Sequence, residues 1–81
     1  MPTYYFDLHR DSPSLDADGV ELPDEGAALV AAARHLGELL RDDADGLVRA
    51  GAWRLEVRDA RRSQVFAVEV ALRMGGPAAP P

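Results

Sequence analysis

The chain has 81 residues, of which 47% are hydrophobic and none is cysteine. This length favours one domain with a thin core, and the composition excludes disulfides, thiolate metal sites and cysteine nucleophiles. The net charge of −5 argues against a nucleic-acid-binding face. The first 20 residues contain no apolar signal segment, and no stretch reaches the length of a membrane span. We therefore expect a cytoplasmic protein with no membrane contact.

The first expected element is a strand over Thr3–His9, where residues alternate with the two-residue period of a half-buried strand. One face carries Tyr4, Phe6 and Leu8, and the other carries Tyr5, Asp7 and His9. After turn residues, Leu15–Leu22 predicts a short second strand that is interrupted at Asp18-Gly19.

A helix is expected next, because Pro23 ends the second strand and Asp24 is a suitable N-cap. Leucine and alanine recur at three- and four-residue spacing up to Arg41, near which the helix should end. Residues 43–51 predict an irregular return, with room for one extra turn at Leu47-Val48.

Two alternating segments, Trp53–Asp59 and Gln64–Arg73, predict a C-terminal hairpin. Trp53 falls on the inward face, which favours a core residue over a ligand-stacking platform. The outer face of the last strand is unusually apolar and carries Val65, Ala67, Glu69 and Ala71. Residues 1–73 should form the domain, and residues 74–81 a disordered tail.

The expected fold is therefore α+β, in the order β-β-α-β-β, with one main helix packed on one face of an antiparallel sheet. A right-handed crossover gives the order 2-1-3-4, counting the expected strands along the chain. The last strand then lies at an edge. A long edge strand with an apolar face is a liability unless it is covered, so we expect it to pair with a second copy or a partner.

Asp7 and His9 share a strand face and are the first candidates for a metal or catalytic site. A zinc site needs three or four ligands, and the only other histidine, His35, is expected in the opposite layer. The preferred interpretation is that Asp7 and His9 pair with Arg54 or Arg58 on the neighbouring strand.

Two further patterns have functional and structural interpretations. The spacing of Ser14, Asp16, Asp18, Gly19 and Glu25 resembles a calcium loop, but Pro23 interrupts it and no helix precedes it. A turn followed by a helix cap explains the same residues. Arg58, Arg61 and Arg62 could bind a phosphate or an acidic peptide, although a solvated turn accounts for them. We predict no catalytic, cofactor or metal site.

The opening strand, the DADGVELPDEGAAL segment and the WRLEVRDARRSQVFAVEV hairpin together resemble a family of small alphaproteobacterial proteins known as a domain of unknown function. Its members open with a YFFDLHDG-like strand and end with an LEVRDExGxPV-like hairpin. The resemblance spans residues 3–72, but this chain lacks the family's glycines after the first strand and in the last turn. It implies a fold and no activity.

The first functional hypothesis is a non-enzymatic interaction or regulatory module that forms a homodimer, or binds a protein partner, through the last strand. The expected surface comprises Tyr5, Asp7, His9, Arg54, Arg58, Val65, Ala67, Glu69 and Ala71. One alternative is an antitoxin-like protein whose acidic half masks a basic partner, because residues 1–47 hold 11 acids and 3 arginines. The least favoured alternative is a metal-binding protein centred on Asp7 and His9. No cofactor and no nucleic acid are expected.

Overall fold

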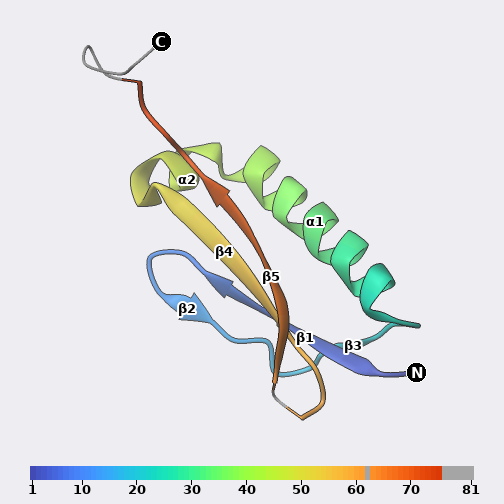
Figure 1. Ribbon diagram of the computed structural model, residues 1–81. Helices are drawn as coiled ribbons and strands as arrows, with labels where there is room; N and C mark the ends of the chain where they lie inside the picture. The colour runs from blue at the N-terminus through green and yellow to red at the C-terminus, as the bar shows by residue number, and fades with distance from the viewer. Residues whose placement is uncertain (62, 76–81) are drawn as a thin grey trace.

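A computed structural model describes residues 1–61 and 63–75. The elements in chain order are β1 (Thr3–His9), β2 (Pro13–Ser14), β3 (Val20–Glu21), α1 (Glu25–Asp42), α2 (Ala44–Ala50), β4 (Ala52–Arg58) and β5 (Gln64–Ala71). The strands form one antiparallel sheet in the order β2-β1-β4-β5, with β3 also paired to β1 (Figure 1). Both helices lie on one side of this sheet. The expected α+β class with an antiparallel sheet is confirmed.

Of the expected second strand, Leu15–Leu22, only Val20–Glu21 is a strand (β3), and the expected order 2-1-3-4 differs in detail. β3 pairs with the start of β1, and a further short strand, β2, pairs with its end. Between them, the Asp16 carboxylate accepts a hydrogen bond from the Phe6 N–H at 3.2 Å. The carboxylate of a short acidic side chain can thus take the place of a backbone carbonyl as the acceptor for a strand N–H. The segment therefore covers the β1 edge as a loop.

A second helix, α2, corrects both the expected irregular return at residues 43–51 and the expected single main helix. Asp43 ends α1, and its carboxylate then caps α2 by accepting a hydrogen bond from the Gly46 N–H at 3.1 Å. An acidic residue is unfavourable at the C-terminus of one helix but favourable at the N-terminus of the next. Asp43 thus explains both where α1 stops and where α2 begins.

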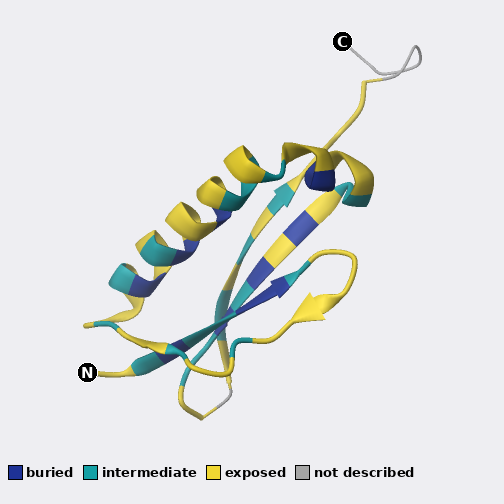
Figure 2. Cartoon of the chain, turned by 180° about the vertical axis from the view of Figure 1, so that it is seen from behind, coloured by how far each residue is buried: buried dark blue, intermediate teal, exposed yellow. Residues whose placement is uncertain are grey.

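The core lies between the helices and the sheet, on the faces that Figure 2 shows as buried. Its buried members are Tyr4, Leu8, Ala28, Ala32, Leu36, Leu47, Trp53, Leu55 and Val57. The inward faces predicted for β1 and β4 are confirmed, and Trp53 belongs to the core as expected.

The strand β5 lies at the end of the sheet and, within the described ranges, pairs with β4 alone. The Leu72 N–H donates to the Gly51 carbonyl at 2.8 Å. This bond identifies which β5 residues direct their N–H and C=O groups toward β4. Because antiparallel residues alternate between bonded and non-bonded pairs, Val70 and Val68 direct their backbone groups toward β4. Ala67, Glu69 and Ala71 therefore direct theirs toward the open edge.

Two glycines with positive φ differ in their surroundings and allow a matched test. At Gly19 (φ +72°), an added Cβ would lie 2.8 Å from Thr3 Cγ2 and 2.9 Å from Tyr5 Cε2. At Gly51 (φ +84°), an added Cβ would meet no atom within 4 Å. We expect Gly51→Ala to lower the free energy of unfolding by about 1 kcal/mol, because alanine is strained in the left-handed backbone conformation. Gly19→Ala should cost about 2–3 kcal/mol, because overpacking adds to the backbone term. Urea denaturation measures both, and equal losses would contradict the close packing of Gly19 on β1.

Candidate functional site

The outer face of the sheet, opposite the helices, is centred on a buried carboxylate. The Asp7 side chain is only 2% exposed. Its two oxygens accept hydrogen bonds from Arg58 Nε and from Arg58 Nη2, the latter at 3.1 Å. The Asp16 N–H also donates to Asp7 Oδ1 at 2.9 Å. A buried charge with such partners is stable in the folded chain, and its hydrogen-bonding capacity is largely used within the molecule.

Asp16 extends this network along the edge of β1. Besides the bond from Phe6, its carboxylate accepts hydrogen bonds from the N–H groups of Asp18 at 3.1 Å and Gly19 at 3.2 Å. These bonds form an Asx-type turn. They account for the acidic spacing that resembles a calcium loop. Within residues 1–61 and 63–75, no group of three or more histidine, aspartate or glutamate side chains is placed to hold a metal ion.

Both network carboxyls have lowered pKa values. The hydrogen bonds from Arg58 are the largest cause for Asp7 and lower its pKa, against the opposing effect of burial. For Asp16, burial is the largest single effect and raises the pKa. The N–H groups of Gly19, Phe6 and Asp18 together outweigh it, so the Asp16 pKa is also below its ordinary value. Both groups are therefore ionised at neutral pH.

These shifts predict acid sensitivity. Because the folded pKa values lie below the unfolded ones, ionisation stabilises the fold fully above the unfolded pKa of about 3.9 and progressively less as the pH falls through the folded values. We expect the free energy of unfolding to decrease below about pH 5. For Asp7→Asn, the free energy of unfolding should decrease less steeply as the pH falls, because one of the two titrating groups is gone. Urea midpoints at a series of acidic pH values test this, and an unchanged slope in the variant would contradict the role of Asp7.

His9 and Arg54 both approach Glu56. His9 Nε2 lies 3.3 Å from Glu56 Oε1, and Arg54 Nη2 lies 2.8 Å from Glu56 Oε2. The structure thus pairs Asp7 with Arg58 as expected. His9 lies directly opposite Arg54 on β4, as expected, although the acid that both bases approach is Glu56. Glu56 itself stands directly opposite Asp7 on β4. Sequence reasoning missed Glu56, although its outward position in the β4 alternation was available as a signal.

The expected interaction surface therefore has two parts. The first comprises Asp7, His9, Arg54 and Arg58 on β1 and β4, which together with Glu56, absent from the prediction, form a polar cluster whose members pair with one another. Tyr5 joins its margin, since the Arg58 guanidinium lies 5.3 Å from the Tyr5 ring centroid. The second is an outer strip on β5, which consists of Val65, Ala67, Glu69 and Ala71. The ionisable groups of the first part pair with one another, and the second part adds only the carboxylate of Glu69.

The other sequence candidates lie apart from this face. His35 borders a hollow with Phe6 and Ala31 on the helical side, so it does not converge with His9. Arg61 is exposed, and its N–H donates to the Asp59 carboxylate at 2.9 Å. Arg62 and residues 76–81 of the expected tail lie outside the described residues. Among the helices described, none has the length and apolarity needed to cross a membrane.

A comparison with protein families gives one result. A family described as Domain of unknown function (DUF6894) matches residues 3–71. The chain belongs to the DUF6894 family. Membership in a family of unknown function is thereby confirmed, whereas alphaproteobacterial origin and the YFFDLHDG-like opening stay predictions. The DUF6894 match runs from the first residue of β1 to the last residue of β5. No curated protein and no solved structure matched the chain.

Proposed function

We propose that this DUF6894 domain is a non-enzymatic interaction module that forms a homodimer through β5. The observation that carries the proposal is the open edge of this eight-residue strand. The backbone groups of Ala67, Glu69 and Ala71 face no other strand in the described part of the chain. A second β5 offers a matching antiparallel ladder, because an edge strand presents alternating donors and acceptors.

The composition of β5 supports this use of the edge. Natural edges are protected by proline, by lysine or other charges, by bulges or by shortness. Glu69 is the single charge in Gln64–Ala71, and the strand has no proline. The opposite edge differs, because β2 and β3 have two residues each and Asp16 caps β1 between them. The two edges are therefore unequal in their capacity to pair.

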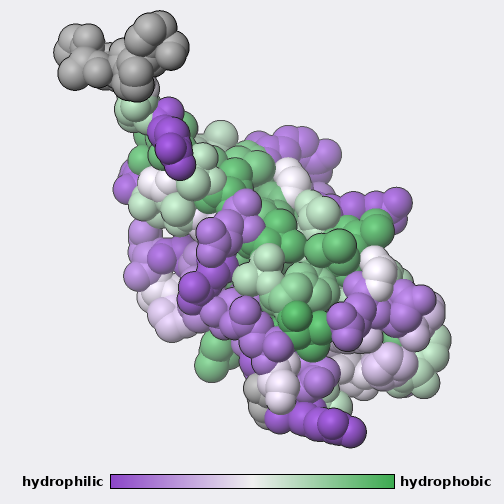
Figure 3. All heavy atoms as spheres, in the orientation of Figure 1, coloured by the Kyte–Doolittle hydropathy of each residue, from purple (hydrophilic) through white to green (hydrophobic). Residues whose placement is uncertain are grey.

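Apolar side chains on β5 would add buried area to such a ladder. The inner face of β5 carries Phe66, Val68 and Val70, which are only half-buried against the core. Figure 3 shows hydrophobic residues gathered along β5 and the adjoining side of α1. A second copy would cover part of this surface, and burial of apolar area is the main favourable contribution to association.

Two-fold symmetry restricts the register of the pairing. Directly paired residues of an antiparallel ladder lie on the same face of the sheet, so the two-fold axis of such a dimer must pass through a single β5 residue. A centre on Glu69 would oppose two like charges directly. Centres on Ala67 or Val68 keep the two Glu69 side chains apart. We therefore place the centre at one of these two residues.

The test is the oligomeric state of the protein in solution. Light scattering from micromolar to near-millimolar concentrations should show a reversible dimer. Ala67→Lys puts a charge at the middle of the edge and should give a monomer with an unchanged circular dichroism spectrum. Ala17→Lys, at the opposite edge, is the matched control and should leave the dimer intact. A monomeric wild type, or equal effects of the two lysines, would contradict the proposal.

The antitoxin-like alternative rests on the charge of the first half of the chain. Residues 1–47 hold 11 acids and 3 arginines, which would attract a basic protein. Such a complex should weaken from low to high salt, because exposed charges are screened. Pairing of β5 depends on backbone hydrogen bonds and apolar contacts, so it should depend little on salt. Co-purification at the two salt concentrations separates these functions.

A further inference from the structure

The rotation of α1 about its own axis follows from two sets of residues. Ala28 and Ala32 are buried, so their line of the helix faces the sheet. Ala31 and His35 border a hollow with Phe6 of β1, and therefore mark the side of the helix that lies toward β1. Because successive residues are rotated by about 100°, the opposite side of α1 can be assigned to the direction of β5.

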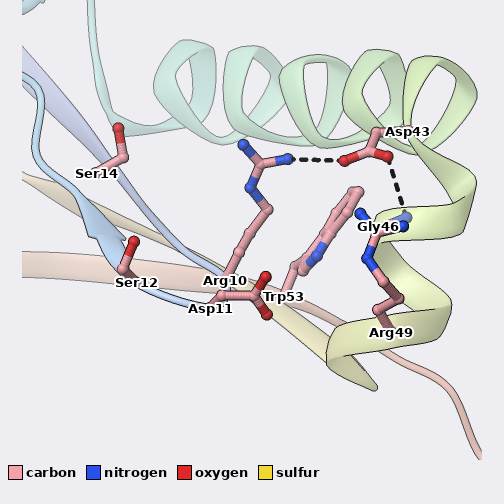
Figure 4. A pocket seen from close by; sticks show the side chains of 8 residues that line it. All are labelled: Arg10, Asp11, Ser12, Ser14, Asp43, Gly46, Arg49 and Trp53. Carbon is pink, nitrogen blue, oxygen red and sulfur yellow. Dashed lines mark hydrogen bonds and ion pairs between the residues drawn. The ribbon is translucent and has the colours of Figure 1, made fainter.

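The C-terminal end of α1 is anchored to the strands beneath it. Asp43 follows the helix, and its Oδ2 lies 3.2 Å from Arg10 Nη1 in the turn after β1 (Figure 4). The Arg10 guanidinium carbon lies 5.3 Å from the centroid of the Trp53 ring on β4, in the range of a cation–π contact. These contacts join the helix end to two strands. The side of α1 that lies toward β5 is thus held in a defined position.

This side of α1 is free of charge and largely open to solvent. It consists of Gly26, Leu29, Ala33, Gly37 and Leu40. Leu29 is 49% exposed, and the two glycines and the alanine are exposed as well. Beyond the first turn, the charged residues of α1 fall on its other sides. An added Cβ at Gly37 would meet no atom of the described chain within 4 Å, although glycine is unfavourable inside a helix. Packing within one copy therefore gives no reason for glycine there.

Pairing of two β5 strands would bring two copies of this side together. Figure 1 shows α1 running along β5, and α1 packs on both β4 and β5. Neighbouring strands lie about 4.8 Å apart, and the two-fold axis would lie half of that spacing beyond β5. A helix above the space between β4 and β5 is then about 5 Å from the axis. The two helices would be about 10 Å apart, close to the spacing of packed helices.

We propose that the two α1 helices of the dimer pack antiparallel against each other, with the two-fold axis at Ala33. This inference rests on the proposed pairing of β5 and extends the interface to a second layer. Residues at equal distances along the chain from Ala33 then lie opposite each other. Leu29 of each copy meets Gly37 of the other, and Leu40 meets Gly26. Each leucine occupies the space that a missing Cβ leaves, so the surface complements itself as a two-fold interface requires.

The area of the β5 edge supports such a second contact. An eight-residue strand is about 26 Å long and a sheet is about 10 Å thick, so the edge alone covers roughly 300 Å² of each copy. Stable specific interfaces cover about 800 Å² of each partner. The helix contact adds apolar area beside the ladder, and burial of apolar area favours association.

Cysteine cross-linking tests the helix contact, because the chain has no cysteine of its own. In Ala33→Cys the two thiols would meet at the two-fold axis. Oxidation with copper phenanthroline should then give a disulfide-linked dimer, at concentrations where light scattering shows a dimer. Arg34→Cys is the matched control at an exposed position rotated by about 100°, and it should cross-link at least about tenfold more slowly. Adding Ala67→Lys to Ala33→Cys should abolish the cross-link, because the helix contact rests on β5.

The outcomes separate this inference from the proposed function. Equal cross-linking rates at positions 33 and 34, in protein that scatters light as a dimer, would overturn the helix contact and leave the β5 pairing intact. A monomeric wild type would overturn both. Cross-linking of Ala33→Cys that persists with Ala67→Lys would overturn the arrangement, since the helices would then associate without β5.

A pair of substitutions tests the contact between leucine and glycine. Gly37→Leu should raise the urea midpoint of the dilute protein, because leucine has the higher helix propensity. It should nevertheless weaken the dimer about tenfold or more, because two leucines would then occupy the same space. Adding Leu29→Ala reopens that space and should recover part of the affinity. A Gly37→Leu dimer as tight as the wild type, or no recovery in the double variant, would contradict the contact.

Discussion

Asp7→Asn is expected to lower the free energy of unfolding by about 3–5 kcal/mol, the usual cost of removing one partner of a buried ion pair. The Asp7 side chain is 2% exposed and that of Arg58 14%. Asparagine is nearly isosteric, but it cannot neutralise Arg58 or accept all of the hydrogen bonds that Asp7 accepts. Domains of this size have about 4–12 kcal/mol of stability in total. The variant should therefore lose a large share of its stability and unfold at a much lower urea concentration than the wild type.

Urea denaturation at neutral pH, followed by circular dichroism, measures this loss. Asp42→Asn is the matched control, because Asp42 pairs with Arg41 at 3.3 Å but its side chain is 69% exposed. Exposed pairs contribute little, so the control should change stability by less than about 0.5 kcal/mol. Adding Arg58→Met to Asp7→Asn should recover part of the loss, because the unpaired charge is then removed. Equal losses in the two asparagine variants would contradict a buried pair.

Leu55→Ala is the second change with a large expected effect. Leu55 is 0% exposed on β4, the strand between β1 and β5, and it belongs to the core under the helices. Its truncation leaves a cavity that neighbouring side chains fill only in part, which typically costs about 2–5 kcal/mol. Because alanine supplies much of the helix surface facing the sheet, few large side chains are available to close the gap.

Leu29→Ala supplies the matched comparison, since Leu29 is 49% exposed on α1. The same atoms are removed, and alanine has the higher helix propensity, so the change in stability should stay within about 0.5 kcal/mol of zero. Thermal denaturation of both variants alongside the wild type is sufficient. A loss at Leu29 as large as that at Leu55 would contradict the assigned core, or would indicate that Leu29 is covered in solution.

Much of the sheet could be predicted because the two-residue period assigns each side chain to a face. The alternation of Thr3–His9 and of Trp53–Asp59 placed Tyr4, Trp53 and Leu55 correctly. The segment Leu15–Leu22 resisted this reasoning. Its conformation depends on the Phe6 N–H, ten residues earlier in the chain, which the Asp16 carboxylate binds. Propensity within the segment carries no information about such a partner.

The helices show the same limit. The end of α1 was predicted near Arg41, one residue before the observed end at Asp42, but the role of Asp43 as the cap of α2 required Gly46 to fold back onto it. In the polar cluster, adjacency of β1 and β4 was enough to predict that Asp7 meets Arg58. The diagonal geometry that draws His9 toward Glu56 depends on the register.

The inequality of the two sheet edges bears on how large an assembly can become. In a dimer paired through β5, the open edge of each copy is covered by the other copy. The edge that stays exposed to solvent is the one that Asp16 and the two-residue strands β2 and β3 cover. No strand then remains to recruit a third copy. A sheet with two pairing edges would grow without limit toward fibrils. In the proposed dimer, Asp16 would therefore stop further growth of the sheet, and its loss should favour filaments over finite particles.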